Sequence, residues 1–420
     1  MSRIQKTTLK SGVRVITEEM IEAESSSIGI WVKTGSRDEP AHLNGMSHFI
    51  EHMLFKGTER RSAHDISREI ESVGGVLNAF TSREYTCFYA KVLNKDIPRA
   101  VDILTDLVMN SVFSKKELEK ERKVIVQEIK MVEDTPDDLI HDLYAESFYK
   151  AHPLGRPILG SIDTIGSFDR KKVVDYFHGR YVRDNVFITA AGGVKHARLV
   201  RLLKSAFGNV NGGAAGDNVK APDASSGVFL FEKDLGQVHL CLGVPAPAQS
   251  DPRRYRTYLL NTILGSGMSS RLFQRIREKG GLVYSVYSYL NLFRDSGSLV
   301  VYAGTSEENF SKVVRLILRE FKNIRKDLTA LEVAEAKSHL KGSILLSLET
   351  SDNRMAKLAK DEIYYKKSVP VREIVREIDR VRPRDVKALA SRLLTPEKAT
   401  LTALGKVEMK GLPRGLKRGG

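Results

Sequence analysis

The sequence contains the same unit twice. Two halves with the same order of expected elements flank a stretch dominated by Gly, Ala, Asn, Asp and Ser at residues 209–227, which is the composition of a flexible linker. In each half, two strand patterns are followed by helical patterns, a second pair of strands, more helices and a closing strand. A period of about 200 residues is too long for a solenoid repeat. The sequence therefore predicts a duplicated domain with a cleft between its copies.

The expected strands alternate apolar or β-branched residues with polar ones, as half-buried strands do. Strands that alternate with helices within each half indicate an α/β or α+β sandwich of one sheet against helices. The opening and closing strands are expected at residues 12–17, 28–33 and 185–191 in the first half and at 227–232, 237–244 and 399–404 in the second.

Short stretches of the two halves also align with each other. Residues 45–47 (Gly-Met-Ser) correspond to residues 267–269, and the strand around 78–81 corresponds to residues 284–289 followed by 297–304. We therefore expect one domain at residues 1–208, the linker at 209–227 and a homologous domain at 228–420.

Composition and charge narrow the class of protein. Hydrophobic residues make up 41% of the chain and charged residues 28%, which excludes disordered and collagen-like chains. The net charge is +15, but the basic residues are scattered and no nucleic-acid-binding module accompanies them, so we expect no nucleic-acid partner. No apolar run approaches the ~18 residues of a membrane span, so no membrane partner is expected either.

Cysteine usage and the first residues bear on location. Cys87 and Cys241 cannot form a disulfide framework, and neither belongs to a Cys-x-x-Cys pair. The chain starts with a polar, strand-like segment that lacks the apolar core of a secretory signal. These features predict a cytoplasmic protein.

The pentapeptide His-Phe-Ile-Glu-His at residues 48–52 carries the clearest chemical signal. Apolar residues at spacings of three and four around it predict a helix with one face toward the core. His48, Glu51 and His52 then fall together on the opposite face, within roughly 100° of one another. Two histidines at i and i+4 can hold one Zn²⁺, and Glu51 is placed to take a proton from a metal-bound water. The competing interpretation is a solvated helix face that carries these side chains without a metal.

A catalytic zinc needs a third protein ligand. A helix is expected between Ser114, which forms a capping box with Glu117, and Pro136. Within it Glu121 and Glu128 are seven residues apart and share a face. Either could be a ligand, or both could be solvated glutamates paired with neighbouring lysines.

The first half resembles the pitrilysin, insulin-degrading enzyme and mitochondrial processing peptidase family of zinc metallopeptidases. The resemblance rests on residues 44–53 (NGMSHFIEHM), 55–58 (FKGT), 74–75 (GG), 78–81 (NAFT) and 152–155 (HPLG). It implies an α+β fold of two tandem homologous domains, each with a mixed, mostly antiparallel sheet against helices. It also implies that Glu128 is the third ligand, through the family pattern E-x6-E, and that Glu121 is a supporting carboxylate.

The resemblance extends to the second half and to a substrate strand. Arg277 and Tyr284 match an arginine and a tyrosine that reach the substrate from the second domain in active members. Asn78, Ala79 and Phe80 match the edge strand on which the family binds its peptide by strand addition. Packing in the core is the alternative role for Phe80.

These observations predict a zinc-dependent endopeptidase with one Zn²⁺ per chain and Glu51 as general base. We expect it to cleave peptides or unfolded segments inside a clamshell chamber, with Glu51, Glu121, Arg277 and Tyr284 as its catalytic group. A homodimer is expected, although a heterodimer is open. Two alternatives remain: a processing-peptidase-like subunit that requires a partner chain, and a non-catalytic basic interaction scaffold.

Overall fold

The computed structural model describes residues 3–207, 212–213, 219–413 and 415–416. Residues 209–211 and 214–218 of the expected linker at 209–227 therefore lie outside the described residues. The chain forms two compact units, each assembled from several segments. The first unit consists of Met1–Lys130, Arg156–Val219 and Ser347–Ser368, and the second of Met131–Gly155, Lys220–Leu346 and Val369–Gly420.

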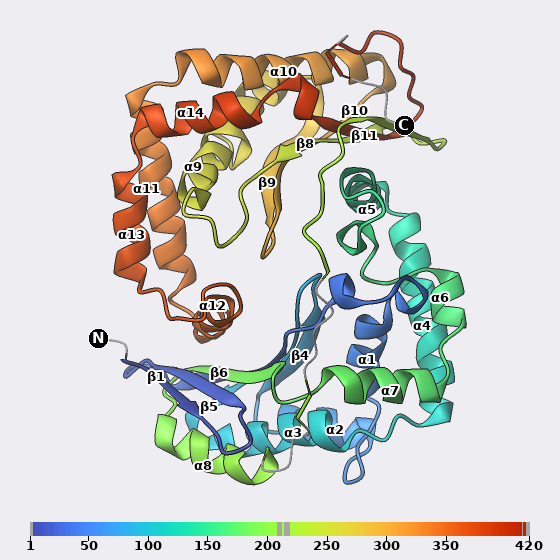
Figure 1. The fold of residues 1–420 in the computed structure, drawn as a ribbon, viewed down its shortest axis with the longest axis vertical. Helices are drawn as coiled ribbons and strands as arrows, with labels where there is room; N and C mark the ends of the chain where they lie inside the picture. Colours follow the sequence, from blue (N-terminus) through green and yellow to red (C-terminus); the bar gives the residue numbers. More distant parts are fainter. Residues whose placement is uncertain (1–2, 208–211, 214–218, 414, 417–420) are drawn as a thin grey trace. The chain divides into compact units, whose positions relative to one another are not determined.

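The first unit is built on a six-stranded sheet with the order β1-β2-β6-β3-β5-β4 (Figure 1). All neighbouring strands are antiparallel except β2 and β6, which are parallel. The strands are β1 (Arg3–Thr8), β2 (Arg14–Glu19), β3 (Ser25–Val32), β4 (Val76–Thr81), β5 (Thr86–Leu93) and β6 (Val186–Gly192).

Helices cover one face of this sheet and enclose the main core of the unit. The core joins Ile28 and Ile30 of β3 and Phe88 of β5 to apolar residues of every helix on that face. These helices are α1 (Met46–Leu54), α2 (Ala63–Glu71), α3 (Ile97–Asn110), α4 (Lys115–Glu133), α6 (Ile162–Gly166), α7 (Arg170–Arg180) and α8 (His196–Ala206).

The opposite face of the first sheet is covered by a helix from far along the chain, α12 (Ser351–Tyr364). Met355 and Leu358 of α12 pack against Trp31 and Phe187, both of which are fully buried. The Thr189 hydroxyl donates to the backbone carbonyl of Met355 at 3.0 Å. Burial of these large apolar side chains makes α12 an integral part of the unit.

The second unit repeats the architecture with five strands in the order β7-β11-β8-β10-β9. Here β7 and β11 are the parallel pair. The strands are β7 (Gly227–Glu232), β8 (Val238–Pro245), β9 (Val283–Leu292), β10 (Gly297–Thr305) and β11 (Thr400–Gly405). This order matches β2-β6-β3-β5-β4, so the predicted duplication and the α+β class are confirmed.

Helices of the second unit are arranged in the same way. One face of the sheet is covered by α9 (Arg254–Gly265), a π-helical segment (Phe273–Glu278), α10 (Phe310–Asp327), α11 (Ala330–Ser347), α13 (Val371–Arg380) and α14 (Pro383–Leu393). The other face is covered by α5 (Pro136–Phe148), which comes from the first half of the chain. The two halves have thus exchanged one helix each, α5 for α12.

One predicted alignment between the halves is wrong. Residues 45–47 lead into α1, whereas residues 267–269 follow α9. Helix α9 occupies the place of α1 in chain order and in packing against the edge strand. Helix α11 occupies the place of α4 in chain order. Among the described residues, no helix is both long and apolar enough to cross a bilayer.

Candidate metal centre

Helix α1 turns one face to the core and begins at a buried carboxylate. Phe49 and Ile50 are fully buried on its inner face. Glu39 accepts the backbone N–H groups of Gly45 at 2.8 Å and of Ser47 at 2.7 Å, which satisfies two donors of the first turn. Gly45 has a φ of 95°, a left-handed conformation that glycine adopts without strain. Burial raises the pKa of Glu39, and these hydrogen bonds act in the opposite direction.

Three donor groups converge on the outer face of α1. Nε2 of His48 lies 3.8 Å, and Nε2 of His52 lies 3.7 Å, from Oε2 of Glu128 on α4. All three ligand atoms lie within 4.8 Å of one another. Ligand atoms that share a tetrahedral zinc are about 3.3 Å apart, because each bond is about 2.0–2.2 Å long. Two imidazoles and a carboxylate at this spacing fit a zinc ion.

Electrostatics favour the metal-binding form of His48. Burial, with a smaller contribution from the neighbouring His52, lowers the pKa of His48 to about 3. At neutral pH the ring is therefore uncharged and offers a nitrogen lone pair, which a metal requires. Within residues 3–207, 212–213, 219–413 and 415–416, no other group of three or more His, Cys, Asp or Glu side chains is close enough together to hold a metal ion.

Glu121 supports the site from behind. Its Oε2 lies 3.1 Å from Nδ1 of His52, and its Oε1 lies 2.9 Å from the ammonium of Lys56. Glu121 is only 4% exposed, so its position is well defined by packing. A carboxylate that accepts the Nδ1 proton of a histidine leaves the Nε2 lone pair free and orients the ring. Lys56, which the sequence reasoning missed, holds that carboxylate in place.

Glu51 lies beside the three donors and is held by β4. The hydroxyl of Thr81 donates to Oε2 of Glu51 at 2.5 Å. Burial is the largest influence on the pKa of Glu51 and raises it, and the charge of Glu128 acts in the same direction. The hydrogen bond from Thr81 and the charge of His52 lower this pKa. The net effect is a carboxylate with a raised pKa, as expected of a group that exchanges protons near neutral pH.

Strand β4 forms the edge of the first sheet next to α1. Leu77, Asn78 and Ala79 line an open hollow of about 300 Å³ together with Glu51 and His52. The side chain of Asn78 accepts the backbone N–H of Ala79 at 2.8 Å. Phe80 is 38% exposed, and its ring contacts Trp31, Tyr85 and Tyr89.

Comparison with known proteins shows what this chain is related to. The family described as Insulinase (Peptidase family M16) matches residues 14–162, and the Peptidase M16 inactive domain matches residues 167–340. An uncharacterized zinc protease of Bacillus subtilis is 39% identical over 397 residues, which cover 94% of this chain and 97% of the relative. The chain belongs to peptidase family M16.

Further relatives agree with this assignment to family M16. An uncharacterized zinc protease of Mycobacterium tuberculosis is 40% identical over 399 residues, covering 93% of this chain and 91% of the relative. A crystal structure of a protease from Helicobacter pylori shares the fold, with a TM-score of 0.90 and 20% identity over 96% of this chain and 100% of that one. The predicted family and the predicted peptidase class are confirmed.

Arg277 and Tyr284 lie together in the second unit of the M16 chain. Tyr284 is 79% exposed near the start of the edge strand β9. The guanidinium carbon of Arg277 lies 5.3 Å from the centre of the Tyr284 ring and 4.8 Å from that of Phe273. This stacking holds the arginine and the tyrosine beside each other at the surface.

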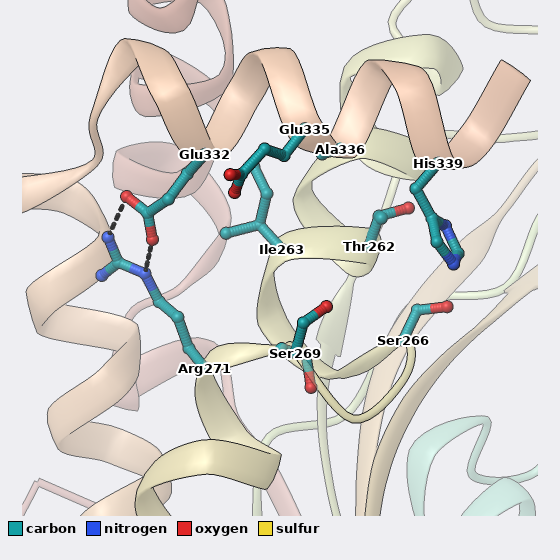
Figure 2. A pocket seen from close by; sticks show the side chains of 10 residues that line it. Thr262, Ile263, Ser266, Ser269, Arg271, Glu332, Glu335, Ala336 and His339 are labelled. Atoms are coloured by element: carbon teal, nitrogen blue, oxygen red, sulfur yellow. Dashed lines mark hydrogen bonds and ion pairs between the residues drawn. The ribbon is translucent and has the colours of Figure 1, made fainter.

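The crevice between α9 and α11 in the second M16 unit corresponds to the one that holds the metal donors in the first. This crevice contains a hollow of about 100 Å³. Figure 2 shows the side chains that line it, several of which come from α11. Arg271 forms a fork of two hydrogen bonds with Glu332, at 2.6 and 2.8 Å. The other side chains labelled around the hollow are Thr262, Ile263, Ser266, Ser269, Glu335, Ala336 and His339.

Proposed function

We propose that this M16 peptidase is a zinc endopeptidase that cleaves peptides or extended segments of unfolded proteins. His48, His52 and Glu128 would hold one zinc ion per chain. The convergence of these three donor atoms within 4.8 Å of one another is the observation that carries the proposal. The naming of relatives at about 40% identity as zinc proteases supports it.

The residues around the three metal donors have separate roles in the proposed reaction. Bound zinc acts as a Lewis acid and lowers the pKa of water. Glu51 accepts the proton of the attacking water and returns it to the departing amine, which a carboxylate with a raised pKa does well. Glu121, with Lys56 behind it, keeps the Nε2 atom of His52 directed at the metal.

We propose that substrate binds as an added strand along β4. An edge strand offers unpaired backbone groups, and backbone pairing accepts many sequences because it does not depend on side chains. Asn78, Ala79 and Phe80 would contact the substrate, and the hollow beside Ala79 would place its scissile bond near Glu51.

Arg277 and Tyr284 are proposed to complete the site from the second unit. A tyrosine hydroxyl can donate to the oxyanion that develops at the attacked carbonyl, and an arginine can anchor a substrate carbonyl or carboxylate. Their stacked arrangement at an exposed position suits this role. We further propose a cytoplasmic homodimer that encloses a chamber, with a heterodimer as the alternative assembly.

Replacement of Glu51 tests the proposal directly. We expect Glu51→Gln to retain zinc at one ion per chain and to lose peptide hydrolysis by on the order of 10²–10⁴-fold, because general base catalysis is removed and the ligands are kept. Zinc content and cleavage of a mixed peptide library are measured side by side with the wild type. Glu59→Gln, on the exposed loop after α1, is the matched control. Full activity in Glu51→Gln would overturn the assignment of the base.

A further inference from the structure

The hydrogen bond between Thr81 and Glu51 joins two parts of the site that are otherwise separate. Glu51 belongs to α1, which carries the metal donors, and Thr81 is the last residue of β4, the edge strand. The Thr81 hydroxyl donates to Oε2 of Glu51. Within the part of the chain that the structure describes, Oε1 of Glu51 takes no hydrogen bond. One carboxylate oxygen is therefore restrained and the other is left for a reacting group.

The alternation of side chains along β4 explains how Thr81 reaches α1. Residues 77, 79 and 81 are less exposed than residues 76, 78 and 80. Leu77 and Ala79 pack against the core that α1 helps to form, so the side chain of Thr81 projects from this same face. The threonine that holds Glu51 is thus fixed to the strand on which the substrate is proposed to lie.

Thr81 is itself held firmly by the turn that follows it. Ser82 donates its backbone N–H to the Tyr85 carbonyl at 2.8 Å, which closes the turn between β4 and β5. The carbonyl of Arg83 accepts the N–H of Arg37 at 2.9 Å, and Arg37 forms a buried ion pair with Glu84 at 2.7 Å. A β-branched side chain also has few rotamers. The hydroxyl therefore has a fixed position against which a carboxylate can be oriented.

We propose that Thr81 is a positioning residue for the reaction. It holds Glu51 so that the free oxygen faces the attacking water, and it ties that orientation to the edge strand. This inference rests on the proposed role of Glu51 as general base. A positioned catalytic group depends on such support, because a misplacement of about 1 Å can cost on the order of 10²-fold in rate.

Two substitutions at Thr81 separate the hydroxyl from the shape of the side chain. We expect Thr81→Val, which keeps the shape and removes the donor, to lower kcat about 10–100-fold with KM changed less than about two-fold. Thr81→Ser, which keeps the donor, should recover most of kcat. Zinc content should stay at the wild-type value in both variants.

Thr86→Val serves as the matched control in the same hairpin. Thr86 pairs with Thr81 across the two strands, but its hydroxyl donates to the Thr34 carbonyl at 3.0 Å and not to Glu51. It should lower thermal stability and leave kcat unchanged. A crystal structure of Thr81→Val gives a readout that does not depend on activity, since the Glu51 carboxylate should leave the conformation seen in the wild type.

The outcomes distinguish this inference from the function on which it rests. If Glu51→Gln is as active as the wild type, the proposed base and the role of Thr81 both fail. If Glu51→Gln is inactive while Thr81→Val has the wild-type kcat, the positioning role alone is overturned. The positioning role is also overturned if Thr81→Ser is as impaired as Thr81→Val. It is overturned as well if Thr81→Val changes KM or zinc content in place of kcat, or if the Glu51 carboxylate keeps its wild-type conformation in the crystal structure of Thr81→Val.

Discussion

The two units of this peptidase share one architecture, but the side chains in their corresponding crevices differ in chemistry. In the first unit, α1 and α4 bring together His48, His52 and Glu128. In the second unit, the corresponding crevice holds the fork between Arg271, which follows α9, and Glu332 of α11. The sheet order is the same in both, so the fold alone does not decide the function. The donor set on two helix faces decides it.

The comparison also shows two ways of joining the segments that line such a crevice. In the first crevice, the side chains that face each other can share an ion, and each helix contributes ligands. In the second, the Arg271 side chain is only 8% exposed and bonds to Asp327 as well as Glu332. A planar guanidinium with two carboxylate partners joins these segments by ion pairs and does not require a bound metal ion.

The largest effect is expected when the same substitution is made in each crevice. His52→Ala should abolish stable zinc binding and lower peptide hydrolysis by on the order of 10³-fold or more, because one of three ligands is lost. His339→Ala should leave both properties unchanged, since His339 lies in the second crevice. Zinc content after dialysis and initial rates of cleavage measure the two effects. Retention of stoichiometric zinc by His52→Ala would contradict the site.

A smaller effect, on the free energy of unfolding, is expected when the ion pairs of Arg271 in the second crevice are removed. Arg271→Met should destabilise the protein by about 1–3 kcal/mol, because two carboxylates lose a partner but remain partly exposed to water. Denaturant-induced unfolding of the zinc-loaded protein measures the change. Zinc content should be unaffected. An unchanged unfolding midpoint would show that the fork contributes nothing to this unit.

The smallest expected effect is the pH dependence of the stability that the ion pair between Arg271 and Glu332 contributes. Burial raises the pKa of Glu332, but hydrogen bonds from Arg271 and Thr329 outweigh it and bring the pKa below its usual 4.5. A group whose pKa is lowered by folding stabilises the protein above the unfolded value and loses that contribution as pH falls through the folded one. The stability difference between wild type and Arg271→Met should therefore narrow below about pH 4.5. A difference that stays constant down to pH 3 would argue against the ion pair.

Regular patterns in the sequence predicted most of the fold. The strand expected at residues 227–232 is β7, a short apolar run, GVFLFE, whose side chains are mostly buried or half-buried. Strand β1 (RIQKTT) lies in the polar, strand-like segment expected at the start of the chain, and it is largely exposed because its residues form no apolar face. The helix exchange was not predictable. An amphipathic pattern shows that a helix covers something apolar, but it does not identify the sheet.

In the candidate site, too, the residues set by local spacing were predictable and those set by tertiary packing were not. His48, Glu51 and His52 follow from helical spacing on α1, which is a local property. Glu128 and Glu121 could not be ranked by pattern alone, since their roles depend on how α4 lies against α1, and the family resemblance was needed. Lys56 and Thr81 have no periodic signal, because each acts through one contact with a distant residue.

The exchange of α5 and α12 has a consequence for any attempt to divide this protein. A fragment that ends near residue 210 would lack α12 and would expose Trp31 and Phe187 on the back of its sheet. The complementary fragment would lack α5 and would expose the apolar surface around Val300. Neither half is a self-sufficient folding unit, but two co-expressed fragments should complement each other, since each carries the missing piece of the other.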